Sequence, residues 1–133
     1  MQKKSPVVHF EMPAGDMGRM KKFYESVFGW KMNQLGPEMG NYVTVATSET
    51  DEQGMIQEPG RINGGFYEKS ADPLSQYPSI VIATDNLEES IEKVKAAGGR
   101  THGDIQPIPG VGRFVSIIDT EGNRISVLES LMK

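Results

Sequence analysis

An internal repeat constrains the fold of this chain more than any other feature of its sequence. One helix is predicted to begin after Asp16 and to end at Gly29, and a second to begin after Asn86 and to end at Gly99. Asp and Asn side chains accept hydrogen bonds from the first N–H groups of a helix, and glycine commonly follows the last turn. An offset of 70 residues separates both 16 from 86 and 29 from 99. The two helices are therefore equivalent parts of a duplicated unit.

Each predicted helix carries apolar residues along one side. In the first helix they are Met17, Met20, Tyr24, Val27 and Phe28, and in the second they are Leu87, Ile91, Val94 and Ala97. Spacings of three and four residues place side chains on one helical face. Each helix is therefore expected to bury that face against a sheet.

Strand-like segments surround both helices. In the first half they are residues 7–12, 30–35, 40–46 and 61–67, and in the second half residues 77–82, 100–105, 112–118 and 124–129. The segments that start at Gly40 and Gly112 are repeat mates with alternating apolar residues, which is typical of strands. Each half is therefore predicted to contain one strand, one helix and three further strands.

We expect a single domain that spans residues 1–133. Its first half covers about residues 5–69, a polar link with a proline covers about 70–76, and its second half covers about 77–133. A surface loop is expected at residues 48–60 and a rigid turn at 107–110. A chain of 133 residues fits one domain and is long enough to bury a continuous core. The predicted fold class is α+β.

Composition excludes several classes of function. The net charge is −4, and Lys and Arg are scattered, whereas nucleic-acid-binding proteins usually carry a basic patch, so we expect no nucleic-acid partner. The absence of cysteine excludes disulfides, thiolate metal sites and cysteine nucleophiles. The N-terminal stretch MQKKSPVVHFEMPAG lacks the apolar run of a signal peptide, and no segment has the ~20 apolar residues of a membrane span. We expect a cytoplasmic protein with no membrane partner.

Four stretches of the sequence are distinctive in their positions within the repeat. They are VVHFEMP, FYESVFGW, LEESIEKVKAAGG and IPGVGRFVSIIDTEGNRISVLE. Together they resemble the vicinal oxygen chelate superfamily, which includes glyoxalases, bleomycin resistance proteins and ring-cleaving dioxygenases. The resemblance implies two tandem βαβββ modules that form a curved, bowl-shaped mixed sheet, with helices on its outer face and substrate in the bowl. It specifies no single activity, because this fold hosts many.

Metal-dependent members of this family take His and Glu ligands from the first and last strands of both modules. Carried over by position, these places hold His9, Asn63 (or Gly64), Ser79 and Ser126. Only His9 is a side chain that Zn²⁺, iron or manganese favours. Glu11 shares the strand parity of His9, whereas Glu129 has the opposite parity to Ser126. We therefore expect no metal cofactor, and His9 is the one weak candidate for a ligand.

The sequence favours a small-molecule-binding protein with a degraded metal site. The predicted cavity residues are His9, Glu11, Asn63, Ser79 and Ser126. The bleomycin-resistance branch of the family implies that the cavity sequesters a ligand without turnover, and no catalytic residue is predicted. Two alternatives stay open, a metal-dependent glyoxalase-like lyase, isomerase or dioxygenase and a regulatory or interaction subunit. Two-module members of the family are commonly homodimers, which we also expect here.

The sequence gives only general expectations for the places of four further side chains. Tyr24 and Trp30 are expected in the core. Tyr42 is the repeat mate of Phe114, and its ring fits either face of the sheet. His102 is expected in a loop or at a sheet edge.

Overall fold

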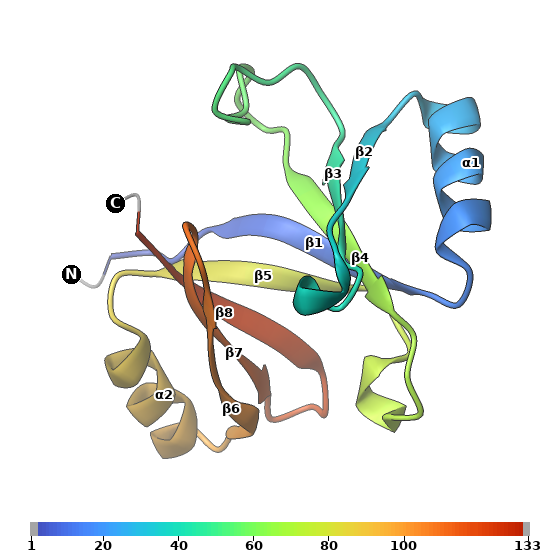
Figure 1. The fold of residues 1–133 in the computed structure, drawn as a ribbon. Helices are drawn as coiled ribbons and strands as arrows, with labels where there is room; N and C mark the ends of the chain where they lie inside the picture. The colour runs from blue at the N-terminus through green and yellow to red at the C-terminus, as the bar shows by residue number, and fades with distance from the viewer. Residues whose placement is uncertain (1–2, 132–133) are drawn as a thin grey trace. The chain divides into compact units, whose positions relative to one another are not determined.

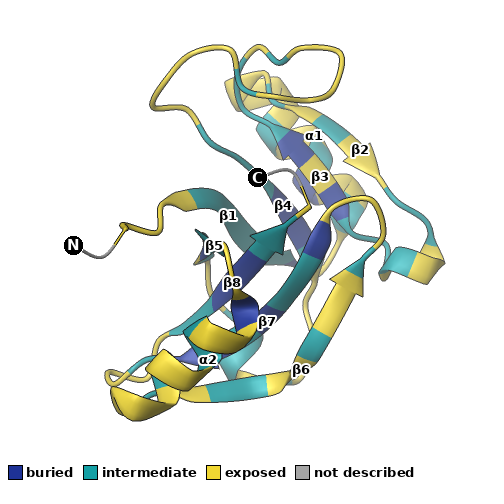
Figure 2. Cartoon of the chain, turned by 90° about the vertical axis from the view of Figure 1, so that its left-hand side faces the viewer, coloured by how far each residue is buried: buried dark blue, intermediate teal, exposed yellow. Residues whose placement is uncertain are grey.

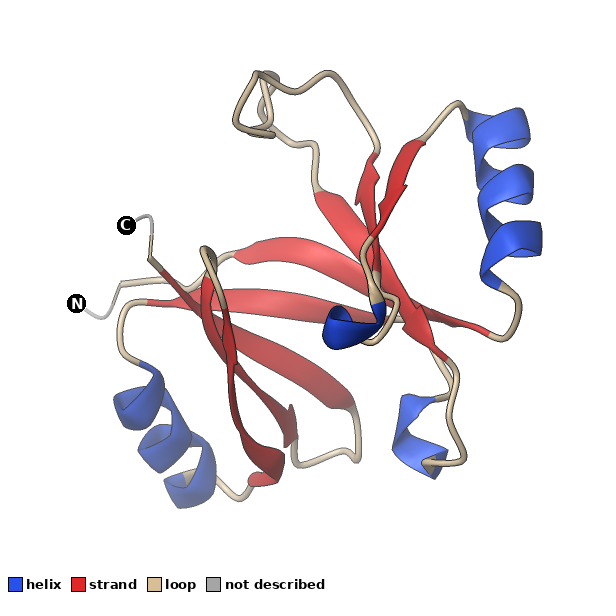
Figure 3. Cartoon of the chain, in the orientation of Figure 1, coloured by secondary structure: helices blue, strands red, loops and turns tan. Residues whose placement is uncertain are grey.

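The computed structural model describes residues 3–131, which form two compact units of strands and helices (Figures 1 and 3). One unit comprises residues 9–78. The other comprises residues 79–131 together with the N-terminal residues 3–8. The predicted α+β fold of two βαβββ modules is confirmed. The organisation into a single domain stays a prediction.

The first unit contains one helix and four sheet strands. Its elements are β1 (Val7–Ala14), α1 (Met17–Phe28), β2 (Lys31–Gln34), β3 (Val43–Ala46) and β4 (Asn63–Glu68). The strand order is β2-β3-β4-β1, in which β1 and β4 are parallel and the other neighbours are antiparallel. The last strand of the module therefore lies beside the first, which brings residues far apart in the sequence together.

The second unit repeats this topology. Its elements are β5 (Ser79–Thr84), α2 (Leu87–Ala96), β6 (Arg100–Ile108), β7 (Gly112–Ile118) and β8 (Arg124–Ser130). The strand order is β5-β8-β7-β6, and here too the first and last strands are the parallel pair. The N-terminal segment joins this unit, because the Ala83 N–H donates to the Pro6 carbonyl at 2.9 Å. The duplication predicted from the sequence is confirmed.

Both helices begin as the sequence predicts, and α1 also ends as predicted. The helix α2 ends at Ala96, earlier than the predicted Gly99. The Asp16 carboxylate accepts the Arg19 N–H at 2.9 Å, and the Asn86 amide oxygen accepts the Glu89 N–H at 3.0 Å. Gly29 ends α1 with a φ of 70°, in the left-handed region that glycine adopts without strain. Within residues 3–131, no helix is long and apolar enough to cross a membrane.

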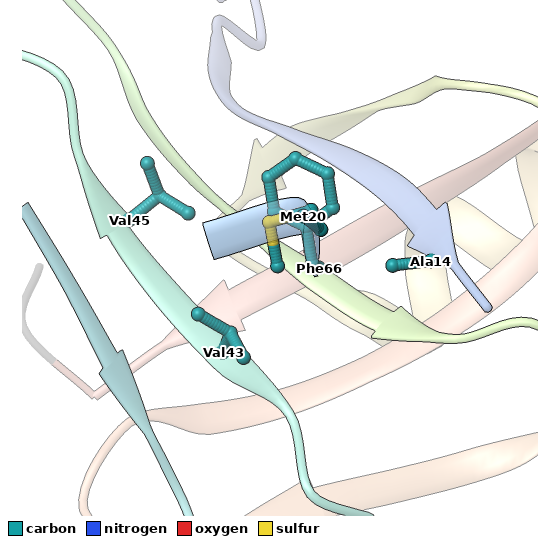
Figure 4. Close-up of a cluster of buried hydrophobic side chains, with 5 residues drawn as sticks. All are labelled: Ala14, Met20, Val43, Val45 and Phe66. Carbon is teal, nitrogen blue, oxygen red and sulfur yellow. The ribbon is translucent and has the colours of Figure 1, made fainter. Parts of the chain in front are cut away.

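Each helix packs on one face of its own sheet and forms a separate core. The first core contains Ala14, Met20, Val43, Val45 and Phe66 (Figure 4), and the second contains Leu87, Val115, Ile117 and Val127. Tyr24 and Trp30 stack at a centroid distance of 4.8 Å against the first core, which confirms their predicted place. Figure 2 shows that buried residues lie mainly along the strands.

Several strands differ from their predicted extents, and two of these differences have a clear local reason. β3 begins at Val43 rather than at residue 40, because Gly40 and Asn41 adopt left-handed conformations with φ of 66° and 57°. β6 continues through Pro107 to Ile108, so the turn predicted at 107–110 is too long. β6 is the last strand in the order of its sheet, where a proline interrupts no ladder of hydrogen bonds.

Candidate functional site

The face of the first sheet that lies opposite α1 carries most of the predicted site residues. Along β1, Phe10 and Met12 pack toward the core, so strand alternation places His9 and Glu11 on the other face. The pairing of β1 with β4 sets His9 beside Asn63 and Glu11 beside Gly65. We call the set of His9, Glu11, Asn63 and Tyr42 the first polar face.

Tyr42 belongs to this face because it binds Glu11. Its hydroxyl donates a hydrogen bond of 2.9 Å to the Glu11 carboxylate. The ring lies directly over Gly65, where an added Cβ would come within 1.9 Å of the Tyr42 hydroxyl oxygen. Burial and the charge of Glu11 raise the pKa of Tyr42 far above its usual value, so the phenol stays protonated and remains a donor.

Asn63 connects the first polar face to the long loop. Its side-chain oxygen accepts the N–H of Thr47 at 3.2 Å, and the Thr47 hydroxyl donates to the Ile62 carbonyl at 2.6 Å. These bonds fix both ends of the segment 48–60 to the sheet. The Asn63 oxygen is therefore already engaged with backbone, and the amide NH₂ is the part of this side chain suited to donate to a ligand.

In the second unit, Ser79 and Ser126 share the equivalent face. Strand β5 runs parallel to β8 with Val81 beside Ser126, so Ser79 lies level with Arg124. The Arg124 guanidinium donates to the Ser79 hydroxyl at 3.4 Å. Ser126 is 2% exposed, and its hydroxyl has no hydrogen-bond partner among residues 3–131. We call Ser79, Arg124 and Ser126 the second polar face.

A buried hydroxyl without a partner is unfavourable by about 1–3 kcal/mol relative to a paired one. Ser126 is the one buried polar or charged residue of the described chain. Its hydroxyl therefore has unused hydrogen-bonding capacity, which a ligand can use only if the groups that cover Ser126 move. His102 lies on the edge strand β6, as predicted, and pairs with Ser116 rather than with Ser126.

Glu129 is excluded from the second polar face by its orientation. Arg113 binds the carboxylates of both Glu129 and Glu88, and Glu88 belongs to helix α2. Glu129 therefore points to the helix side of the sheet, opposite to Ser126, as its strand parity predicts. Hydrogen bonds from Arg113 lower the pKa of Glu88 to about 2, so Glu88 is ionised at neutral pH.

The donors at the four family positions do not suit a divalent metal. They are one imidazole, one amide and two hydroxyls, and hydroxyls neither balance a 2+ charge nor bind it strongly. The Asn63 oxygen is engaged with Thr47, and Ser79 lies beside the positive charge of Arg124. Within the described part of the chain, no group of three or more His, Cys, Asp or Glu side chains is placed to hold a metal.

Acidification is expected to destabilise the protein through His9. Burial lowers the pKa of His9 from its usual 6.5, so the folded protein takes up this proton less readily than the unfolded chain. Stability from the neutral imidazole is fully present above about pH 6.5 and is lost as pH falls through that value toward the folded pKa. The melting temperature of wild type should fall more steeply than that of His9→Gln between about pH 8 and pH 5. Parallel curves would contradict this.

Comparison with known proteins identifies the family. The family model described as Glyoxalase/Bleomycin resistance protein/Dioxygenase superfamily matches residues 7–127. A glyoxylase-like domain-containing protein from Didymella fabae is 33% identical over 116 residues, which are 85% of this chain and 84% of that protein. A lactoylglutathione lyase from Salmonella typhimurium is 23% identical over 128 residues, which cover 93% of this chain and 92% of the lyase.

Solved structures share the fold at low sequence identity. A hypothetical protein from Bacillus halodurans superposes with a TM-score of 0.70 and 15% identity, over 98% of both chains. Methylmalonyl-CoA epimerase from Mycobacterium tuberculosis superposes with a TM-score of 0.65 and 14% identity, over 96% of this chain and 91% of the epimerase. At such identities the likeness concerns the fold alone.

Proposed function

We propose that this chain, which belongs to the Glyoxalase/Bleomycin resistance protein/Dioxygenase superfamily, binds a small organic molecule without a divalent metal. The observation that carries the proposal is the set of donors at the family's metal positions. One imidazole stands there with no carboxylate, and the Arg124 guanidinium lies beside Ser79. The guanidinium opposes a metal cation at the Ser79 position and leaves hydrogen bonding as the means of recognition.

Each polar face is assigned residues for ligand contact. They are His9, Glu11 and Asn63 on the first polar face, and Ser79 and Ser126 on the second. Glu11 contributes a carboxylate, whose oxygens accept hydrogen bonds, as one already does from the Tyr42 hydroxyl. The lowered pKa of His9 keeps its imidazole neutral near pH 7, with one donor and one acceptor nitrogen. The first polar face therefore favours a ligand rich in hydrogen-bond donors.

A metal-dependent lyase is the alternative that the similarity to lactoylglutathione lyase supports, since the match covers most of both chains. That function requires a divalent metal, which the donor types at the family's ligand positions do not favour. We further propose that the protein is cytoplasmic. We also propose a homodimer, because among the described residues β2 and β6 each pair with only one strand and leave one edge unpaired. Sedimentation velocity tests the homodimer.

A thermal-shift screen tests the binding function. The screen should contain donor-rich metabolites and glycopeptide-like antibiotics, with chelator present throughout. A ligand at 100 times its Kd stabilises the folded state by about 2.7 kcal/mol. We expect Glu11→Gln to lose most of this stabilisation, whereas Glu25→Gln, an exposed control on α1, keeps it. Equal stabilisation of both variants, or a ligand that binds only when a metal is added, would contradict the proposal.

A further inference from the structure

A hollow of about 450 Å³ lies on the helix side of the first unit. It is bounded by α1, by the ends of β1 and β4, and by Gln76 and Pro78 of the segment that follows β4. Its apolar wall includes Met12, Met20 and Phe66, and Figure 4 shows Met20 and Phe66 together in the core. Small-molecule sites typically enclose about 300–1,000 Å³ and are mainly apolar, so the hollow has a suitable size and lining.

Two cations stand at the rim of this hollow. Arg19 and Lys69 both line it with exposed side chains, and neither side chain has an ion pair or hydrogen bond within residues 3–131. The Lys69 N–H donates to the Ala14 carbonyl at 3.0 Å, which fixes the lysine backbone at the end of β1. Asp16 also lines the hollow, but its carboxylate caps α1 through the Arg19 N–H. The rim therefore carries one excess positive charge in a chain of net charge −4.

A second hollow of about 400 Å³ adjoins the first. Both are lined by Met12 and Pro78, and the second adds Phe10 and Trp30, whose ring centroids are 5.5 Å apart. The apolar surface thus continues along β1 away from Arg19 and Lys69. A molecule with a charged end at the rim has room for a chain or ring extending over this surface.

We propose that this hollow is a binding site for a small amphipathic anion, with its apolar body on Met12, Met20 and Phe66 and its anionic group between Arg19 and Lys69. The site is distinct from the first polar face. Strand alternation directs Met12 to the helix side of β1 and Glu11 to the opposite side. The two sites therefore favour different ligands. The first polar face favours a ligand rich in hydrogen-bond donors, and the hollow favours an anion.

Isothermal titration of the full chain with octanoate, octanol and octylamine tests the proposal. The three probes share one apolar chain and differ in the charge of the head group. An exposed ion pair contributes about 0.2–1 kcal/mol, so octanoate should bind roughly 1.4- to fivefold more tightly than octanol, and octylamine more weakly. The double variant Arg19→Gln/Lys69→Gln should lose this preference. Lys22→Gln, which removes an exposed lysine of α1 outside the hollow, should retain it.

A second variant tests the position of the apolar body. Gly15 lines the hollow, and an added Cβ there meets no heavy atom within 4 Å, so Gly15→Leu is compatible with folding. Gly15→Leu should weaken the binding of octanoate and of octanol to the same extent, whereas Glu11→Gln should change the binding of neither. The proposal would be overturned if none of the three probes bound, or if octanol bound as tightly as octanoate. It would also be overturned if Lys22→Gln lost the preference for octanoate as the double variant does. The metal-free function at Glu11 is tested separately and would survive this result.

Discussion

Replacing Gly112 with alanine is expected to destabilise the protein by about 3 kcal/mol or more, in the range of severe overpacking. Gly112 opens β7 with a φ of 153°, and an added Cβ would stand 2.0 Å from the Glu129 carbonyl oxygen of the neighbouring strand. A backbone atom of a paired strand cannot move away without breaking the pairing of β7 with β8. Urea denaturation of wild type and variant measures the change in the free energy of unfolding.

The repeat supplies a matched control for this substitution. Gly40 is the repeat mate of Gly112 and also has a positive φ, of 66°, but an added Cβ there meets no heavy atom within 4 Å. Gly40→Ala should therefore cost only the strain of the left-handed conformation, about 1–2 kcal/mol. Equal free energies of unfolding for the two variants would contradict the close approach of β7 to β8 at Gly112.

Replacing Gly65 with alanine is expected to disrupt the first polar face and to destabilise the protein by about 2 kcal/mol. The new Cβ would lie 1.9 Å from the Tyr42 hydroxyl oxygen and 2.2 Å from the ring carbon that bears it. The ring must then swing away, which breaks its hydrogen bond to Glu11. Ligand-induced stabilisation should decrease together with the free energy of unfolding.

A double-mutant cycle separates the clash between the alanine at position 65 and the Tyr42 ring from a general destabilisation of the sheet. Tyr42→Ala removes the ring that the alanine at 65 would meet, so adding Gly65→Ala to it should cost little more. Residues in contact typically show coupling energies of about 0.5–3 kcal/mol. Strict additivity of the two single substitutions would show that Tyr42 does not lie over Gly65.

The succession of helices and strands along the chain is predictable because its signals are local and occur twice. Asp16 and Asn86 cap their helices through contacts three residues away, and each apolar face follows a fixed spacing. The error at Pro107 has a different origin. A proline reads as a turn in the sequence, but the edge position of β6, which tolerates it, depends on the fold of the whole module.

The candidate site is only partly visible in the sequence. Strand parity correctly directs Glu129 away from Ser126, and the β1–β4 pairing sets His9 beside Asn63. The bond between Tyr42 and Glu11 joins residues 31 positions apart, so no local pattern reveals it. The sequence contains one indication of this contact, because a glycine at position 65 leaves space for the Tyr42 ring on that face of the sheet. The hollow beside Arg19 depends on side-chain packing, which periodicity does not describe.

Metal analysis of the protein, purified without chelator, tests the central claim most directly. Inductively coupled plasma mass spectrometry should find no zinc, nickel, manganese or iron above the level in the buffer, and titration with each ion should show no saturable binding. This result follows from a donor set with one imidazole, no carboxylate and a guanidinium beside Ser79. One equivalent of bound metal per chain, lost in His9→Ala, would contradict the claim and favour a metal-dependent lyase.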